Sequence, residues 1–274
     1  MKRLLQGLVL TALLTGCQQP VEEEPLANPP AEEREEAAED NSTNERDYAE
    51  DEGEQEAEEQ EESSAPTASY QINQANWTVE PVTDEEEQVV LLTIDDAPDQ
   101  HSLEMAETLK ELEKQAIFFV NGHFLADESG KEKLKTIYEM GFEIGNHTMN
   151  HANLSERSDE EQRREIVELN ELIEEVTGER PRFFRAPFGV NTETSAAVVE
   201  EEEMIAMNWT YGYDWEADYQ DAEALAEIMV DTPYLTNGAN LLMHDRQWTL
   251  EALPAIINGL EKEGFEFVDP AVIQ

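Results

Sequence analysis

The 274-residue chain has few basic residues and one cysteine. Lys and Arg together number 17 against 65 Asp and Glu, which gives a formal net charge of −48. That charge repels phosphate backbones, so nucleic acid is excluded as a partner. The one cysteine, Cys17, excludes a disulfide framework and any metal site built from several thiolates. The chain also lacks the G-x-S-x-G sequence that surrounds the nucleophile of many serine hydrolases.

Long hydrophobic runs are also absent, and the N-terminal run is short. Two basic residues precede apolar residues 4–14, a stretch too short for a permanent membrane span. It ends in Leu14-Thr15-Gly16-Cys17, which resembles the bacterial lipobox. We therefore predict a lipoprotein signal peptide at residues 1–17, with acylation of Cys17 anchoring the protein to the extracytoplasmic face of the cell membrane. The alternative is an ordinary secretory signal with a chance cysteine.

Residues 18–68 are predicted to be a disordered acidic linker. Residues 21–62 contain 20 acidic and 2 basic residues, a net charge of −18, and almost no aliphatic or aromatic side chains. Such a segment buries too little apolar surface to fold, and its charges keep it extended. With the +2 of Lys2 and Arg3, −32 remains for residues 63–274. Because this excess of acidic residues is distributed over the segment and not clustered, it favours adaptation to high salt or high pH over binding of a specific cationic partner.

Residues 69–274 are predicted to form one α/β domain. Apolar runs typical of buried strands alternate with amphipathic segments, the clearest of which places Ile166, Leu169, Ile173 and Val176 on one helix face. Repeated strand–helix units indicate a parallel sheet, either open or closed into a barrel, and about seven units suit a barrel. The strands are expected near residues 89–94, 116–120, 142–144, 182–184, 204–207, 240–243 and 265–268. The other helices are expected near 102–114, 131–140, 192–203, 221–230 and 250–262.

Polar side chains follow five of these strands, where the sites of α/β proteins form. They are Asp95-Asp96, His147-x₃-His151, Arg185-Ala186-Pro187-Phe188-Gly189, Asp214-Trp215 and His244-Asp245. Two histidines four residues apart lie on one face of a helical turn and can chelate one ion. The Asp pair alone suits a turn and an N-cap equally well. Five strand ends, each with ionisable or metal-binding side chains, together indicate a functional site.

These segments resemble the motifs of the polysaccharide deacetylase family, also called the NodB-homology domain or carbohydrate esterase family 4. Thr93-Ile94-Asp95-Asp96-Ala97-Pro98 is similar to T-F-D-D-G-P, and residues 147–151 fit H-[ST]-x-x-H. Residues 185–189 fit R-x-P-x-G, Asp214-Trp215 matches D-W, and Leu242-Met243-His244 matches L-x-H. The resemblance covers residues 85–270 and implies a deformed (β/α) barrel with an outer layer of helices.

The resemblance also implies a divalent-metal-dependent deacetylase. Asp96, His147 and His151 would be the metal ligands, and this donor set suits Zn²⁺ while tolerating Co²⁺, Ni²⁺ or Mn²⁺. Asp95 would be the general base that deprotonates the attacking water, and His244 the general acid that protonates the leaving amine.

Further site residues follow from the same resemblance. Arg185 would orient Asp95, and Asp214 would fix the tautomer of His244. The backbone N–H of Phe188 would stabilise the oxyanion, while Trp215 and Leu242 would line the substrate site.

Three departures from the family motifs affect the surroundings of these residues. Ala97 replaces the usual Gly and would be strained by a positive φ at that turn. Ile94 replaces Phe, and Phe188 stands where many relatives have Tyr. Each departure leaves the predicted ligands and proton-transfer groups in place.

The favoured function is N-deacetylation of an extracellular glycan by a monomeric, membrane-anchored enzyme. Peptidoglycan is the nearest candidate, with chitin-type oligomers of N-acetylglucosamine as another. One alternative is an O-acetyl esterase acting on acetylated xylan. The other is a non-catalytic glycan-binding lipoprotein whose metal site has been spoiled at Ala97.

Overall fold

The computed structural model describes residues 69–82 and 88–274. The predicted signal peptide, Cys17 and the acidic linker at residues 18–68 lie outside the described residues. Among the described residues, no helix is long and apolar enough to cross a membrane.

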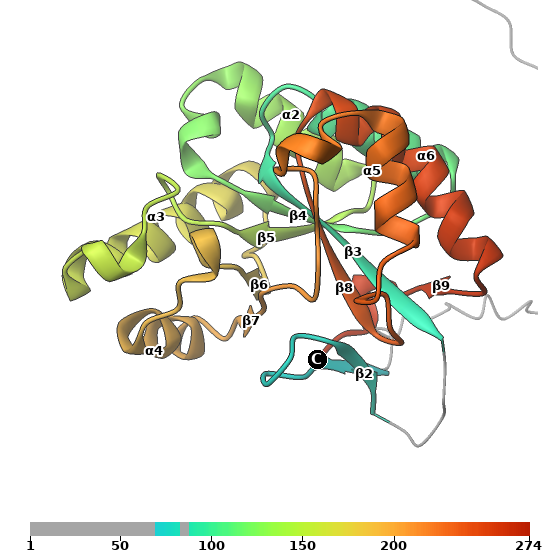
Figure 1. Ribbon diagram of the computed structural model, residues 1–274. Helices are drawn as coiled ribbons and strands as arrows, with labels where there is room; N and C mark the ends of the chain where they lie inside the picture. Colours follow the sequence, from blue (N-terminus) through green and yellow to red (C-terminus); the bar gives the residue numbers. More distant parts are fainter. Residues whose placement is uncertain (1–68, 83–87) are drawn as a thin grey trace, which may run out of the picture. The chain divides into compact units, whose positions relative to one another are not determined.

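A seven-stranded parallel sheet forms the centre of the domain, in the order β7-β6-β5-β4-β3-β8 (Figure 1). Its strands are β3 (Val89–Ala97), β4 (Ile117–Val120), β5 (Glu143–Asn146), β6 (Phe183–Phe184), β7 (Ile205–Ala206), β8 (Ala239–His244) and β9 (Glu266–Phe267). β9 pairs with the start of β3. Tyr211, in the loop after β7, forms a parallel bridge with Leu241 of β8, so the two edges of the sheet approach each other. The sheet is therefore a curled, deformed (β/α) barrel, as predicted.

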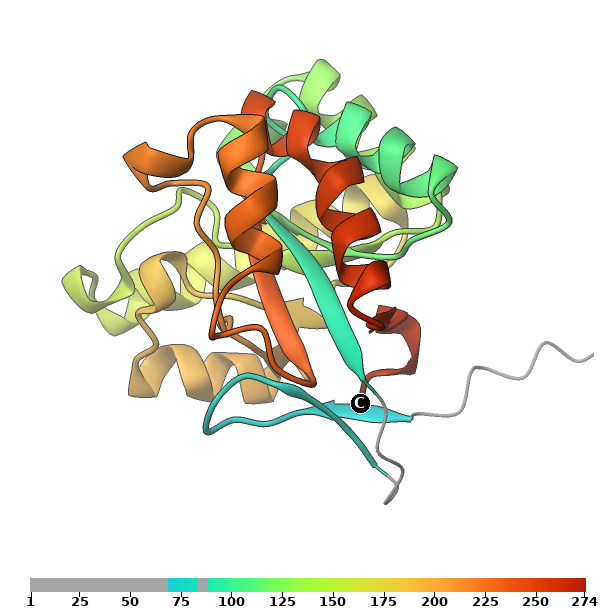
Figure 2. The same cartoon turned by 45° about the vertical axis from the view of Figure 1, so that its right-hand side comes forward.

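Six α-helices of the described chain connect the strands and cover the outer face of the sheet. They are α1 (Ser102–Glu111), α2 (Glu128–Glu139), α3 (Asp159–Thr177), α4 (Glu193–Glu201), α5 (Ala222–Val230) and α6 (Gln247–Lys262). Helices α5 and α6 lie side by side outside β3 and β8 (Figures 1 and 2). The predicted helices all exist, although α2 and α6 begin three residues before the expected starts.

Helix α3 shows how the sequence sets these boundaries. Ser158 and Glu161 form a capping box at its start, which satisfies backbone N–H groups that have no partner inside the helix. Gly178 ends the helix with φ 88°, a conformation that costs glycine little. Ile166, Leu169 and Ile173 are buried, and Val176 packs partly buried against the core, so the predicted apolar face is confirmed.

Alternation along β3 decides which side chains face the inside of the barrel. Val90, Leu92 and Ile94 belong to the cluster that packs against the helices. Val89 and Leu91 belong to a second cluster on the concave face. Because side chains alternate along a strand, Thr93 and Asp95 point to the same inner face as Leu91.

A hairpin of β1 (Tyr70–Ile72) and β2 (Val79–Pro81), which the sequence patterns did not predict, covers the amino end of the barrel. Ile72 and Val79 join the inner apolar cluster. The backbone N–H of Val79 donates to the carbonyl of Gly238, just before β8. The inner core is thereby closed at one end, and the carboxyl ends of the strands remain open for a site.

Candidate active site

A cavity of about 400 Å³ opens at the carboxyl ends of the strands. Arg185 and Asp214, the two predicted residues with functional side chains that do not line it, are fully buried behind it. The structure therefore brings the predicted residues from five separate strand ends to one place. The cavity is lined by Asp95, Asp96, His147, His151, Phe188, Trp209, Trp215, Leu242, His244 and Arg246.

Asp96, His147 and His151 have the arrangement of a metal site. One potential ligand atom from each lies within 4.8 Å of the others. His147 Nδ1 lies 2.7 Å from the carbonyl oxygen of Arg185. A carbonyl can only accept, so Nδ1 carries the proton and the lone pair of Nε2 is free for a ligand. This backbone contact fixes the tautomer that metal binding requires.

The protonation states of the three groups suit a cation. Burial lowers the pKa of His147 and also that of His151, so both imidazoles favour the neutral form. Burial would raise the pKa of Asp96, but nearby His244, the two imidazoles and Arg246 lower it below its usual value. Two neutral nitrogens and one carboxylate oxygen fit a divalent ion such as Zn²⁺.

The segment from His147 to His151 is not the predicted helical turn, so that expectation is wrong. No helix is assigned between β5 and the short turn at Leu154–Glu156. Thr148 has φ 69° and His151 has φ 53°, both left-handed and therefore incompatible with an α-helix. The two rings still approach, with centroids 5.0 Å apart. A strained loop, and not a helix, therefore brings the two histidine rings close enough to bind one ion.

Glu165 of α3 holds this loop in place. Its side-chain oxygens accept from the backbone N–H of Asn150 at 2.8 Å and from Asn150 Nδ2 at 2.9 Å. Its backbone carbonyl accepts from the N–H of Met149 at 2.8 Å. Asn146 Oδ1 accepts from the N–H of Thr148. Backbone strain of this kind persists only where the surroundings enforce it, and these contacts supply that restraint.

Asp95 and Arg185 form an ion pair that is almost completely buried. Arg185 Nη1 lies 2.7 Å from Asp95 Oδ1 and 2.8 Å from Thr93 Oγ1, and the guanidinium stands over the ring of Phe119. Asp95 Oδ2 lies 3.5 Å from His147 Nε2. One carboxylate oxygen is thus held from behind while the other faces the ligand cluster.

Asp214 and His244 form the second pair. Asp214 Oδ1 lies 2.7 Å from His244 Nδ1, and Oδ2 accepts from the backbone N–H of His244 and from Thr249 Oγ1. Burial would lower the pKa of His244, but the hydrogen bond and charge of Asp214 raise it above its usual value. Because Nδ1 donates to the carboxylate, Nε2 is the ring nitrogen left for a substrate.

Two exposed aromatic rings stand beside the histidines. Phe188 is 64% exposed, and its ring centroid lies 4.7 Å from that of His151. Trp215 is 46% exposed, and its ring lies 5.5 Å from that of His244. Exposed aromatic faces at a cavity rim suit the apolar faces of sugar rings.

The strain expected at Ala97 does not occur. Ala97 is absent from the described residues with positive φ, whereas Asp96, just before it, has φ 64°. The methyl group of Ala97 is buried in the helix-facing cluster. The replacement of glycine therefore removes no site residue and introduces no strain at its own position.

The sequence patterns assigned no role to several residues that support the site, although they placed Asp245 at a strand end. Asn240 of β8 accepts from Arg185 Nη2 and donates to the carbonyl of Asn208. Asp245 accepts from backbone N–H groups 100–102 and from Ser102 Oγ, and so fixes the start of α1. Arg246 binds Asp96. The sequence could have indicated Asn240, because it is an amide inside an apolar strand. No sequence feature pointed to Arg246.

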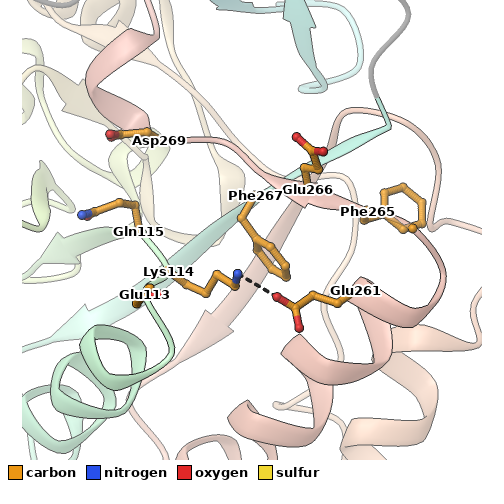
Figure 3. A pocket seen from close by; sticks show the side chains of 9 residues that line it. Glu113, Lys114, Gln115, Glu261, Phe265, Glu266, Phe267 and Asp269 are labelled. Atoms are coloured by element: carbon orange, nitrogen blue, oxygen red, sulfur yellow. Dashed lines mark ion pairs between the residues drawn. The ribbon is translucent and has the colours of Figure 1, made fainter.

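A larger groove of about 720 Å³ lies elsewhere, beside the amino ends of β4 and β9 (Figure 3). Lys114 pairs there with Glu261 at 2.7 Å and lies over the ring of Phe267. The remaining ionisable groups of its lining are acids. The site described above is smaller but contains the ligand cluster and both buried pairs.

The structure combines a deformed (β/α) barrel with a candidate metal site in the cavity at the carboxyl ends of its strands. Residues 82–206 match the family model described as polysaccharide deacetylase, and residues 1–18 match that of the prokaryotic membrane lipoprotein lipid attachment site. A peptidoglycan-N-acetylglucosamine deacetylase of Bacillus cereus is 30% identical over 192 residues, which cover 66% of this chain and 69% of the relative. The chain belongs to the polysaccharide deacetylase family, carbohydrate esterase family 4.

Solved structures agree on the fold and differ in activity. A peptidoglycan N-acetylglucosamine deacetylase in complex with an N-hydroxybenzamide compound is 27% identical, with a TM-score of 0.61, and the match covers 68% of this chain and 87% of that one. A family 4 pseudoenzyme from Bacillus anthracis is also 27% identical with a TM-score of 0.61. That match covers 68% of this chain but only 64% of the pseudoenzyme. Family membership alone therefore does not decide whether a chain is active.

Proposed function

We propose that this protein is a divalent-metal-dependent N-deacetylase of an extracytoplasmic glycan containing N-acetylglucosamine. The observation that carries the proposal is the assembly of one metal-type cluster and two oppositely arranged acid–cation pairs in a single cavity. Peptidoglycan is the nearest candidate because several relatives are peptidoglycan-N-acetylglucosamine deacetylases.

Asp96, His147 and His151 would hold the ion, most plainly Zn²⁺, with Co²⁺, Ni²⁺ or Mn²⁺ as substitutes. When bound, such an ion polarises an acyl oxygen and lowers the pKa of a water near it. The chain's contribution is to keep both imidazoles neutral and Asp96 ionised, as burial and neighbouring charges do here.

Asp95 is the proposed general base. Arg185 fixes Oδ1 from inside the barrel, and Oδ2 faces the ligand cluster, where the attacking water would lie. The buried guanidinium has no route to solvent, so its charge acts on Asp95 with little screening. Asp95 accepts a proton from the water as the water attacks the acetyl carbon.

His244 is the proposed general acid on the opposite side of the cavity. Asp214 holds Nδ1 and raises the pKa of the ring, so protonated His244 persists to higher pH. Nε2 then donates its proton to the leaving amine, which becomes the free amino group of the sugar. An amine leaves poorly without this proton, so the acid is as necessary as the base.

The backbone N–H of Phe188 is the proposed oxyanion donor. Phe188 has φ 59° in the turn Pro187–Gly189 (η3), and no acceptor for its N–H is found within the described part of the chain. An N–H kept free beside the ligand cluster is available for the negative oxygen of the tetrahedral intermediate. Trp215 and Leu242 would contact the sugar.

The domain plan follows the same proposal. Residues 1–17 would be the lipoprotein signal, residues 18–68 the linker, and residues 69–274 the catalytic domain. The match of residues 1–18 to a lipid attachment site supports anchoring through Cys17 on the extracytoplasmic face. A linker of this length would let a monomeric catalytic domain reach glycan at a distance from the lipid.

The test uses the purified full-length protein. The protein is stripped with chelator and reloaded with Zn²⁺ or Co²⁺, and acetate release is measured from N-acetylglucosamine oligomers, peptidoglycan and acetylated xylan. Metal-dependent acetate from either N-acetylated substrate is expected. Release from xylan alone would contradict N-deacetylation and establish the esterase. Metal binding without release from any of the three would place this chain with the family's pseudoenzymes.

A further inference from the structure

The guanidinium of Arg246 lies at the candidate metal site, and the family motifs assign this residue no role. It follows His244 and Asp245 and directly precedes α6, and its side chain is 37% exposed at the cavity. Nη1 donates to the backbone carbonyl of Asp245 at 2.8 Å, and Nη2 donates to Asp96 Oδ2 at 2.9 Å. Two separate acceptors thus fix the orientation of the guanidinium plane.

The two oxygens of Asp96 face different partners. Oδ1 lies 3.6 Å from His151 Nε2, inside the ligand cluster. Oδ2 is the oxygen bound by Arg246. The carboxylate is only 16% exposed, so its charge is not satisfied by solvent alone. Rotation that brought both oxygens to the cluster would break the charge-assisted hydrogen bond between Arg246 and Asp96.

Asp245 makes this position of Arg246 rigid. Its carboxylate accepts from the N–H groups of residues 100–102, and its own N–H donates to the carbonyl of Asp95. The carbonyl that Arg246 binds therefore belongs to a residue locked to both α1 and β3. Asp96 itself has φ 64°, a strained conformation for a non-glycine residue.

We propose that Arg246 is a positioning residue that holds Asp96 as a one-oxygen ligand and thereby favours small ions of low coordination number. The inference rests on the proposed metal site. Zn²⁺ and Co²⁺ accept four ligands, with one oxygen from a carboxylate, whereas Ca²⁺ requires six to eight oxygen ligands and often takes both oxygens of a carboxylate. Blocking the second oxygen selects against the larger ion by geometry, at a site whose three donors already suit a transition metal.

The experiment compares full-length wild type, Arg246→Ala and Arg246→Lys without substrate. Chelator competition gives the dissociation constants for Zn²⁺ and Co²⁺, and the visible absorption of the Co²⁺ protein reports coordination number. Arg246→Ala is expected to weaken Zn²⁺ binding by about 10- to 100-fold, the usual effect of losing a group that orients a metal ligand. Its Co²⁺ bands should weaken, because higher coordination gives weaker absorption. Arg246→Lys should recover part of the affinity, since an ammonium can still donate a hydrogen bond to Asp96 but cannot make the two-point contact of the guanidinium.

Arg163→Ala is the matched control. Arg163 pairs with Glu201 at 2.6 Å in an exposed position, so its loss removes the same charge without touching the site. Thermal unfolding of all variants shows whether each is folded. If wild type binds neither ion, the proposed function fails. If wild type binds metal and Arg246→Ala keeps the same affinity and the same Co²⁺ spectrum, only the inference about Arg246 is overturned, and a raised KM would then identify it as a substrate contact.

Discussion

Each end of the cavity has an aspartate paired with a basic side chain, and the two pairs are oriented in opposite ways. At the β3 end, the cation of the Asp95–Arg185 pair is fully buried and the acid reaches the cavity. At the β8 end, the acid of the Asp214–His244 pair is buried, and the imidazole of His244 lines the cavity with 18% of its side-chain surface exposed. In the proposed mechanism, the member of each pair that lines the cavity decides whether that end accepts or donates a proton.

The proposed base and the proposed acid therefore differ in the chemistry of their buried partners. The guanidinium of Arg185 can only donate hydrogen bonds, so Asp95 is the acceptor of this pair. A buried carboxylate stabilises the protonated imidazole, so it holds His244 as a donor. In the proposed mechanism, the charge of the buried partner, Arg185 or Asp214, therefore sets the role of the residue that lines the cavity.

Removing the base should give the largest effect on rate. Asp95→Asn keeps the size of the side chain but cannot accept a proton, so kcat is expected to fall by about 10²- to 10⁴-fold, the usual contribution of general base catalysis. Steady-state kinetics on peptidoglycan measure this, with the exposed Asp218→Asn as control. Near-normal kcat in Asp95→Asn would mean that another group is the base.

Removing the hidden cation should affect folding as well as rate. Arg185→Met leaves Asp95 as a buried charge without a partner, which is expected to cost about 3–5 kcal/mol of unfolding free energy. Urea unfolding measures the loss. The double variant Arg185→Met/Asp95→Asn should recover much of that stability, because it no longer buries an unpaired charge. Recovery of stability without recovery of activity would separate the two roles of the pair.

Altering the hidden acid should move the pH profile. The pKa of His244 is raised in the folded protein, so its protonated form is lost only as pH rises through that elevated value. In Asp214→Asn the charge of Asp214 is gone, and the pKa falls. The alkaline limb of the kcat profile is therefore expected to shift to lower pH, while activity at lower pH is less affected. An unchanged limb would show that His244 does not control it.

The same linkage predicts a pH-dependent stability. The Asp214–His244 interaction stabilises the fold fully below the unfolded histidine pKa of about 6.5, and this stabilisation is lost as pH rises through the higher folded pKa. Asp214→Asn should lose this part of the pH dependence. Thermal unfolding from neutral to alkaline pH compares the two proteins.

Removal of the exposed aromatic rings at the rim of the cavity should give the smallest effects on kinetics. Phe188→Ala and Trp215→Ala remove exposed rings beside the metal-type cluster and His244, respectively. Each is expected to raise KM several-fold, which corresponds to a loss of about 1 kcal/mol of substrate-binding free energy. Little change in the free energy of unfolding is expected, because the rings are exposed. A large fall in kcat for Trp215→Ala would indicate that it also orients His244.

Much of the site could be predicted because its residues are local to strand ends. Asp95, His147, Arg185 and His244 follow apolar runs, and the carboxyl ends of parallel strands meet at one edge of the sheet. The motif spacing located the candidate metal ligands, but the sequence patterns misassigned the conformation of the segment between His147 and His151. That loop is held by Glu165 of α3, a long-range contact that no local pattern contains.

The amino-acid sequence by itself determined the alternation of strands and helices, the apolar face of α3, the family and the identity of the residues that meet in the cavity. Those features depend on periodicity and on short motifs, which are local. The tertiary structure alone decided which member of each ion pair is hidden, that Asp96 and not Ala97 takes the left-handed conformation, and that Arg246 binds the second oxygen of Asp96. These depend on burial and on contacts between distant segments, because only the folded chain places one partner of each pair behind the cavity and the other in its lining.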